Sequence, residues 1–343
     1  MDSSTVDWLS IDLGICKCPP NPHCTRRVTE SDESTLDDLP HDSRSGARAS
    51  WLFWSAMSSF GLLYLILVIS LVVVDFQFAS WGDIRQSLND ERVQFSIGLS
   101  LLTCSISAII SIWISVPTGF LLARFDNTAI SLRFRKRPTL RRVVLFGRYL
   151  VDTLLDIPIV LPPLVIGISL LVLFQTPVGR FIDESAGSFF STIGFPGIRG
   201  VTYEIPAIIL AQVTVGAAFA IRTMRDTFEQ IDPRPEQVAL TLGATPYQSF
   251  SRVALPQSWR GMVAAFTLAW ARSLGEFGPI LIFAGTARMK TEVLSTTVYL
   301  NFQFGNLRGA VVASLILVSV AISVLVFTRL LTLGGTLGRR TSL

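Results

Sequence analysis

Long apolar segments that contain almost no charged residues dominate this sequence. Only 16% of all residues are charged, whereas soluble domains carry about 25%. A helix needs about 20 residues to cross the hydrocarbon layer of a membrane, and it bonds all of its backbone polar groups internally. The sequence therefore predicts an all-α membrane protein with about six transmembrane helices. The predicted spans are residues 52–74, 96–122, 157–174, 205–221, 262–284 and 310–328. The three prolines of the third span predict a kink there.

The ends of the chain have a different composition. Residues 1–50 are polar and contain several prolines and acidic residues, so they bury too little apolar surface to fold alone. We predict a disordered tail at 1–50 and a second short tail at 334–343. The first tail contains Cys16, Cys18, His23 and Cys24. Their spacing matches no established zinc pattern, so we expect no metal site.

The distribution of Lys and Arg predicts the orientation of the chain in the membrane. With the N-terminus placed in the cytoplasm, 21 of the 29 Lys and Arg residues fall on the inner side and 7 on the outer side. Such an excess is typical of cytoplasmic loops. We therefore expect both termini to be cytoplasmic. The basic residues are explained by topology and by contact with lipid head groups, and nucleic acid is not an expected partner.

One cytoplasmic connection, residues 233–256 between the fourth and fifth spans, is too long for a simple turn. Residues 236–242 predict a short helix, with Glu236 in the first turn, where the helix dipole favours a carboxylate. Gly243 provides the break after it. Residues 247–254 predict a second short helix with Phe250 and Val253 at helical spacing, ended by Leu255 and Pro256. Such a helix–glycine–helix element at the inner face of a membrane suits a protein partner.

This loop resembles the cytoplasmic loop of permease subunits of ABC importers, in which Gly follows Glu by seven positions and the motif ends in Leu-Pro. The matching residues are Glu236, Gly243, Val253, Leu255 and Pro256. The Ala-Ala pair of that motif is replaced by Gln237 and Val238, so the first turn is expected to pack differently on its partner. Further segments resemble the molybdate/tungstate and sulfate branch of these permeases. They are residues 156–163, 176–180, 271–278, 283–285 and 291–295.

The resemblance covers roughly residues 95–333 and implies a type I ABC importer permease fold in the inner (plasma) membrane. Residues 51–94 then form the first transmembrane helix and an outer loop before this core. The resemblance implies three partners: a cytoplasmic ATP-binding subunit that receives the loop, an extracytoplasmic substrate-binding protein, and a second permease subunit. Molybdate or tungstate is the first substrate expected, with sulfate or thiosulfate as the alternative. Molybdate-type systems pair identical permeases, so we expect a homodimer.

No enzymatic activity is expected of the chain itself. It lacks the G-x-x-x-x-G-K-[ST] motif that cradles nucleotide phosphates. We accordingly expect no catalytic residues and no cofactor. An ATP-independent secondary transporter or channel is the alternative class of function, but inverted repeats and acidic residues buried in several spans are not found.

The fifth span contains the candidate pathway and gate residues. Arg272 and Glu276 lie four positions apart and can face each other on one side of a helix. They form either a charge pair that lowers the cost of burial in the membrane, or a positive site along the path of an anion. Gly275 and Gly278 either permit close helix packing or form a hinge.

Overall fold

The computed structural model describes residues 43–124, 138–192, 194, 197 and 199–340. Within these residues the chain is helical and contains no β-strand, which confirms the all-α prediction. Most of the predicted tail, residues 1–42, lies outside the described part. Helix α1 (Ser43–Phe78) begins eight residues before the predicted boundary, and α15 (Leu307–Arg340) runs through 334–340. Neither boundary carries a proline that would end a helix.

The chain divides into two compact units, residues 1–66 and 67–343, and the boundary falls within α1. In the first unit, the described residues belong to α1. In α1, Phe53–Phe78 is apolar and long enough to cross a membrane, as predicted for the first span. The second unit contains all the other helices and all the candidate functional residues.

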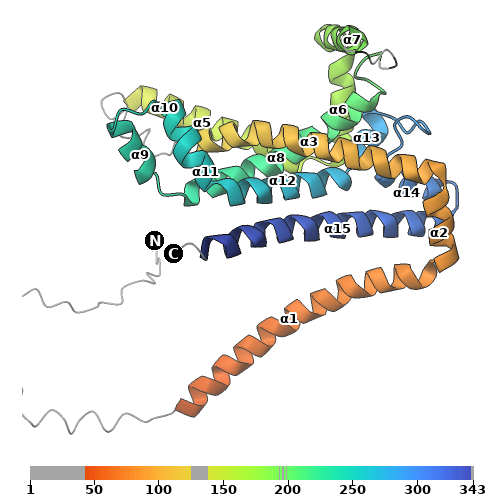
Figure 1. The fold of residues 1–343 in the computed structure, drawn as a ribbon, viewed down its shortest axis with the longest axis horizontal. Coiled ribbons are helices and arrows are strands. Elements are labelled where there is room, and N and C mark those ends of the chain that lie inside the picture. The colour runs from red at the N-terminus through yellow and green to blue at the C-terminus, as the bar shows by residue number, and fades with distance from the viewer. Residues whose placement is uncertain (1–42, 125–137, 193, 195–196, 198, 341–343) are drawn as a thin grey trace, which may run out of the picture. The chain divides into compact units, whose positions relative to one another are not determined.

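Three long helices pack side by side at the centre of the second unit: α3 (Glu91–Arg124), α8 (Ile205–Gln230) and α12 (Trp259–Leu274) (Figure 1). Small residues line their contacts, which lets the backbones approach closely. On α3 these are serines spaced mostly by four, on the buried side of the helix. The buried serines of α3 are Ser96, Ser100, Ser107, Ser111 and Ser115.

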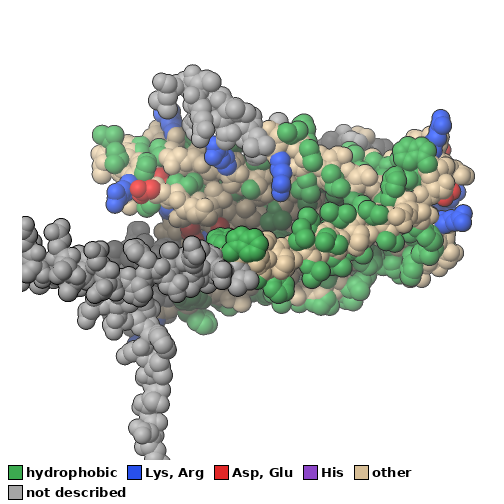
Figure 2. Space-filling model, turned by 90° about the horizontal axis from the view of Figure 1, so that it is seen from below, with side chains coloured by type: hydrophobic (Ala, Val, Ile, Leu, Met, Phe, Trp, Pro, Cys, Tyr) green, Lys and Arg blue, Asp and Glu red, His purple; other side chains and the backbone are tan. Residues whose placement is uncertain are grey.

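The other helices surround this layer. At one end lie the short helices of residues 233–257, and at the other end lie α2 (Trp81–Asn89) and α14 (Leu294–Gln303) (Figure 1). Helix α15 packs on α12 and α14. Hydrophobic side chains gather on the right-hand part of the visible face, and charged side chains lie at both ends and, less densely, between them (Figure 2). This distribution is typical of a protein whose surroundings are lipid along the middle.

In the part of the chain that the structure describes, four helices are long and apolar enough to cross a membrane, and a fifth span exists if one bent pair is counted. The pair is α5 (Pro138–Val160) and α6 (Pro163–Gln175), bent by 112°. The bend confirms the kink predicted for the third span. However, α5 begins at Pro138, so the region before residue 157 is a helix and not only a connection. The bend falls at Leu161 and Pro162, and Pro163 opens α6, where its missing N–H is not needed.

The predicted fifth span, 262–284, is not one continuous helix. Helix α12 ends at Leu274 and α13 (Gly278–Phe283) follows after three residues. Pro279 lies at the start of α13, where it has no N–H to continue the helix from α12. The break lets α13 pack against α6: a Cβ atom on Gly167 would lie 2.9 Å from the Cα of Pro279. Apolar length alone therefore overestimated this span.

Helix α7 (Pro177–Thr192) follows α6.

The close contact between α3 and α8 leads to a first prediction. A Cβ atom on Gly119 would lie 2.9 Å from both the backbone nitrogen of Arg225 and the Cβ of Met224. Gly119→Val should therefore push the two helices apart and lower stability by about 1–3 kcal/mol, the usual cost of overpacking. Heating the detergent-purified protein and measuring its remaining monodisperse fraction checks this. Gly98→Val is the matched control. Gly98 lies on the same helix as Gly119, and a Cβ atom there would have no neighbour within 4 Å. Equal losses for both variants would contradict the prediction.

Candidate functional site

The first half of the loop has the local structure predicted for it. Pro233 precedes α9 (Arg234–Thr241), which contains Glu236 in its first turn. Gly243 has a φ of +91°, in the left-handed region that side chains other than glycine rarely adopt. The chain therefore reverses at Gly243 and enters the second half of the loop.

The second half is longer than predicted. It consists of α10 (Pro246–Ser249), a π-helical turn (Phe250–Ala254) and α11 (Leu255–Gln257). Leu255 and Pro256 thus do not end the helix, contrary to the prediction. The Leu255 N–H donates to the Phe250 carbonyl, five residues back, and this wider turn accommodates Pro256 within the helical run. The hydroxyl of Thr245 caps the start of α10 by accepting from the Gln248 N–H at 3.3 Å.

Apolar packing fixes the second half of the loop to the central helices. The ring of Phe250 lies 4.7 Å from that of Phe120 on α3 and 6.5 Å from that of Phe228 on α8, measured between centroids. Leu255 packs against the same core and is half-buried. Val253 is also half-buried, whereas Pro256 is exposed. Phe250 and Leu255 therefore anchor the loop to its own chain.

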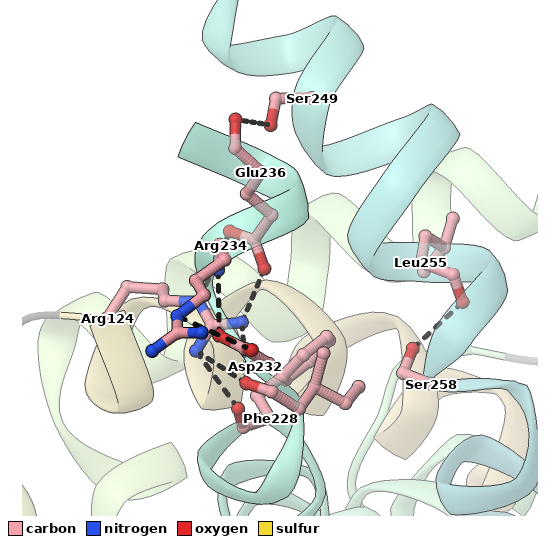
Figure 3. Close-up of polar contacts among 9 residues, drawn as sticks. Arg124, Phe228, Asp232, Arg234, Glu236, Ser249, Leu255 and Ser258 are labelled. Carbon is pink, nitrogen blue, oxygen red and sulfur yellow. Dashed lines mark hydrogen bonds and ion pairs between the residues drawn. The ribbon is translucent and has the colours of Figure 1, made fainter. Parts of the chain in front are cut away.

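Glu236 also points into its own chain. It is buried, and its carboxylate forms an ion pair with Arg124 at the end of α3 (Figure 3). The Ser249 hydroxyl donates to the backbone carbonyl of Glu236 at 3.2 Å and so ties α9 to α10. Arg124 was missed in the sequence analysis because it lies 112 residues before Glu236, and no local pattern joins them.

The exposed side of the loop carries large apolar side chains. Leu242 is 82% exposed and Tyr247 is 77% exposed, one on each side of Gly243. Val238 and Leu240 on α9 are exposed as well. None of the four is among the docking residues singled out from the sequence, although Val238 and Leu242 recur at a spacing of four, as on one face of a helix. Large exposed apolar patches mark interaction sites, so this face suits a partner protein.

The structure brings Arg272 and Glu276 together as the spacing predicts. Arg272 Nη1 lies 2.7 Å from Glu276 Oε1. Among the described residues, no donor has the geometry of a hydrogen bond to this oxygen, so the contact is an ion pair. The Glu276 side chain is 1% exposed and that of Arg272 is 33% exposed. The Arg272 guanidinium lies 5.7 Å from the centre of the Phe219 ring. Arg272 is therefore paired with a buried carboxylate, while part of its own side chain stays accessible to solvent.

The candidate gate glycines lie on either side of Glu276 in the sequence. Gly275 directly follows the last residue of α12 and Gly278 opens α13, so both lie at the break in the predicted fifth span. A Cβ on Gly278 would lie 3.3 Å from the backbone nitrogen of Leu164, whereas one on Gly275 would meet only carbonyls nearly 4 Å away. Of the two interpretations given for these glycines, close helix packing therefore applies to Gly278. The pair and the loop lie at opposite ends of α12, so the structure does not bring the two candidate sites together.

Comparison with known proteins identifies the family. Residues 138–333, more than half of the chain, match the family model described as "Binding-protein-dependent transport system inner membrane component". The chain belongs to this family. It is thus an ABC importer permease, which is a membrane subunit and not an ATPase, as predicted. The alternative of an ATP-independent transporter or channel is accordingly not supported.

Individual relatives of this permease are named for different oxyanions. The chain is 32% identical to the sulfate transport system permease protein CysT of Escherichia coli, over 82% of this chain and 91% of that protein. It is 31% identical to the molybdate/tungstate transport system permease protein WtpB of Pyrococcus abyssi, over 80% and 93%. The resemblance to the molybdate/tungstate and sulfate branch is therefore confirmed.

The fold of the permease is also found in a solved structure. A chain of a bacterial alginate ABC transporter, crystallised with a periplasmic protein bound to an alginate pentasaccharide, matches with a TM-score of 0.59. The match covers 83% of this chain and 94% of that chain at 18% identity. It confirms the predicted ABC importer permease fold.

Proposed function

We propose that the exposed apolar face of residues 233–256 receives a cytoplasmic ATP-binding subunit, and that this permease forms the transport pathway between the two sides of the membrane. The observation that carries the proposal is the contrast between the two faces of the loop. Phe250 and Glu236 are tied to the central helices, whereas Leu242 and Tyr247 contact solvent. A loop that is fixed to the central helices on one face and exposed to a partner on the other face transmits the partner's motion to the membrane helices.

The proposed cargo is a tetrahedral divalent oxyanion. The names of the relatives divide between sulfate and molybdate/tungstate, ions that share this shape and charge. Molybdate or tungstate remains the first candidate and sulfate or thiosulfate the second. The half-exposed Arg272 supplies a positive charge in the membrane part of the chain, which lowers the barrier to an anion. The break at Gly275 is the proposed hinge.

The proposed assembly has the permease in the inner membrane with both termini in the cytoplasm. The excess of Lys and Arg in the connections that include residues 233–256 supports this orientation. A second copy of the chain is proposed to complete the pathway, and an extracytoplasmic substrate-binding protein to deliver the ion.

Expression of the permease together with the ATP-binding and substrate-binding proteins encoded beside it tests the function. We expect the ATP-binding subunit to co-purify and vesicles to take up one radiolabelled oxyanion only when ATP is present. Sulfate, thiosulfate, molybdate and tungstate are to be compared in separate assays, and competition among them identifies the preferred ion. Vesicles without the ATP-binding subunit are the control. Uptake that does not need ATP, or uptake of none of the four ions, would refute the proposal.

A further inference from the structure

Arg124 joins three segments of the permease at a single point. It is the last residue of α3, and its guanidinium donates to the end of α8, to the residues just after it, and to α9 (Figure 3). Nη1 donates to the Phe228 carbonyl at 3.1 Å, and Nη1 and Nη2 both lie 3.4 Å from the Ile231 carbonyl. Nε donates to Glu236 Oε2 at 3.2 Å, and Nη2 bonds the other carboxylate oxygen.

These contacts use the particular geometry of arginine. A planar guanidinium presents several N–H groups in a fixed fork and can bond a carboxylate with two of them. A lysine has one nitrogen and cannot reproduce the two-point contact with Glu236 while it also bonds two carbonyls. The carbonyls of Phe228 and Ile231 lie at the end of α8, where the helix itself supplies no donors.

The pair is largely closed to solvent and to any partner. The Arg124 side chain is 19% exposed and the Glu236 side chain 10%. The carboxylate of Glu236 is therefore occupied within the chain, and docking falls to the exposed apolar side of the loop. Phe120, one turn before Arg124 on α3, packs against Phe250. One end of α3 thus holds both halves of the loop, α9 through Arg124 and the π-helical turn through Phe120.

We infer that Arg124 is the positioning residue that couples the docked loop to the membrane helices α3 and α8. This inference rests on the proposed function of the loop. Without the ion pair, α9 remains attached through the backbone around Ile231 to Pro233 and through Ser249. A displacement of α9 by a partner would then be absorbed largely in that short connection, and it would reach α3 only indirectly, through Ser249 and the packing of Phe250 on Phe120. With the pair in place, α9, α3 and the end of α8 move together.

A purely structural role for Arg124 makes a different prediction. Capping the end of α8 requires only the contacts with the Phe228 and Ile231 carbonyls. Glu236→Gln keeps that cap and removes only the charge pair with α9. A cap alone therefore predicts that Glu236→Gln is neutral, whereas coupling predicts that it resembles Arg124→Gln.

The test uses the complete transporter, reconstituted in liposomes with its ATP-binding and substrate-binding proteins. Three quantities are measured: recovery of the ATP-binding subunit, the rate of ATP hydrolysis, and oxyanion transported per ATP. For Arg124→Gln and Glu236→Gln we expect full recovery of the subunit and continued hydrolysis. Transport per ATP should fall about tenfold, as expected when a coupling contact between sites is lost. Arg124→Lys should lie between wild type and Arg124→Gln. The exchange Arg124→Glu with Glu236→Arg should restore part of the transport per ATP.

Arg92→Gln is the matched control, because Arg92 is exposed in the first turn of the same helix, far from the loop. It should behave as wild type. Wild-type transport per ATP in Arg124→Gln and Glu236→Gln would overturn the inference, and so would loss of the ATP-binding subunit from either variant. If Arg124→Gln fails to fold, Glu236→Gln alone decides between the two outcomes. Failure of the wild-type permease to retain an ATP-binding subunit would refute the proposed function itself, so the two failures are distinguishable.

Discussion

Replacing Leu242 and Tyr247 together by Asp is expected to abolish recovery of the ATP-binding subunit with the permease. The two side chains are 82% and 77% exposed and flank the turn at Gly243. Fully burying a large apolar side chain contributes about 1.5–3 kcal/mol, and every 1.4 kcal/mol changes affinity tenfold. Losing two such contacts should therefore weaken binding at least about hundredfold, before the cost of burying two carboxylates is added.

Affinity purification of tagged permease followed by quantification of the ATP-binding subunit measures this effect. Val178→Asp on α7 is the control, since Val178 is also an exposed apolar residue but lies outside the loop. The thermal stability of both variants should match that of the wild type, because neither position belongs to the packed core. Normal recovery of the subunit in the double variant would show that a different surface of the permease binds it.

The parts of this permease that follow from local pattern could be predicted from the sequence. Apolar length predicted the long helices, and the Pro, Glu and Gly at 233, 236 and 243 predicted α9 and the turn after it. These features depend on residues that are close in sequence. The segment match at 233–256 similarly pointed to the family that the comparisons confirm.

Features that depend on distant residues could not be predicted in this way. The Arg124–Glu236 pair joins residues 112 positions apart, and the inward direction of Glu236 follows from it. The break between α12 and α13 was not predicted, because the segments on both sides of it are apolar and Gly275 and Gly278 indicated only close packing or a hinge. Packing against Gly167 on α6, more than 100 residues earlier, accompanies that break. The π-helical turn before Leu255 likewise reflects packing of Phe250 on two other helices.

Arg272→Gln is expected to reduce oxyanion uptake about tenfold or more while the permease still assembles. The substitution leaves Glu276, whose side chain is 1% exposed, without a countercharge in the membrane part of the protein. Breaking a buried ion pair by removing one partner costs about 3–5 kcal/mol. The remaining carboxylate would also repel a divalent anion. Uptake by reconstituted liposomes and co-purification of the ATP-binding subunit measure the two effects separately.

The double variant Arg272→Gln with Glu276→Gln separates the two interpretations of the pair. It removes both charges, so no unpaired charge stays buried and stability should return toward that of the wild type. If the pair only lowers the cost of burial, uptake should return as well. If Arg272 attracts the passing anion, uptake should stay low, because the positive charge is still missing. We expect the second result. Arg272 is 33% exposed whereas its partner is buried, and an ion pair whose only role was to lower the cost of burial would not need a solvent-accessible arginine. Wild-type uptake in the double variant would assign the pair to structure and remove Arg272 from the pathway.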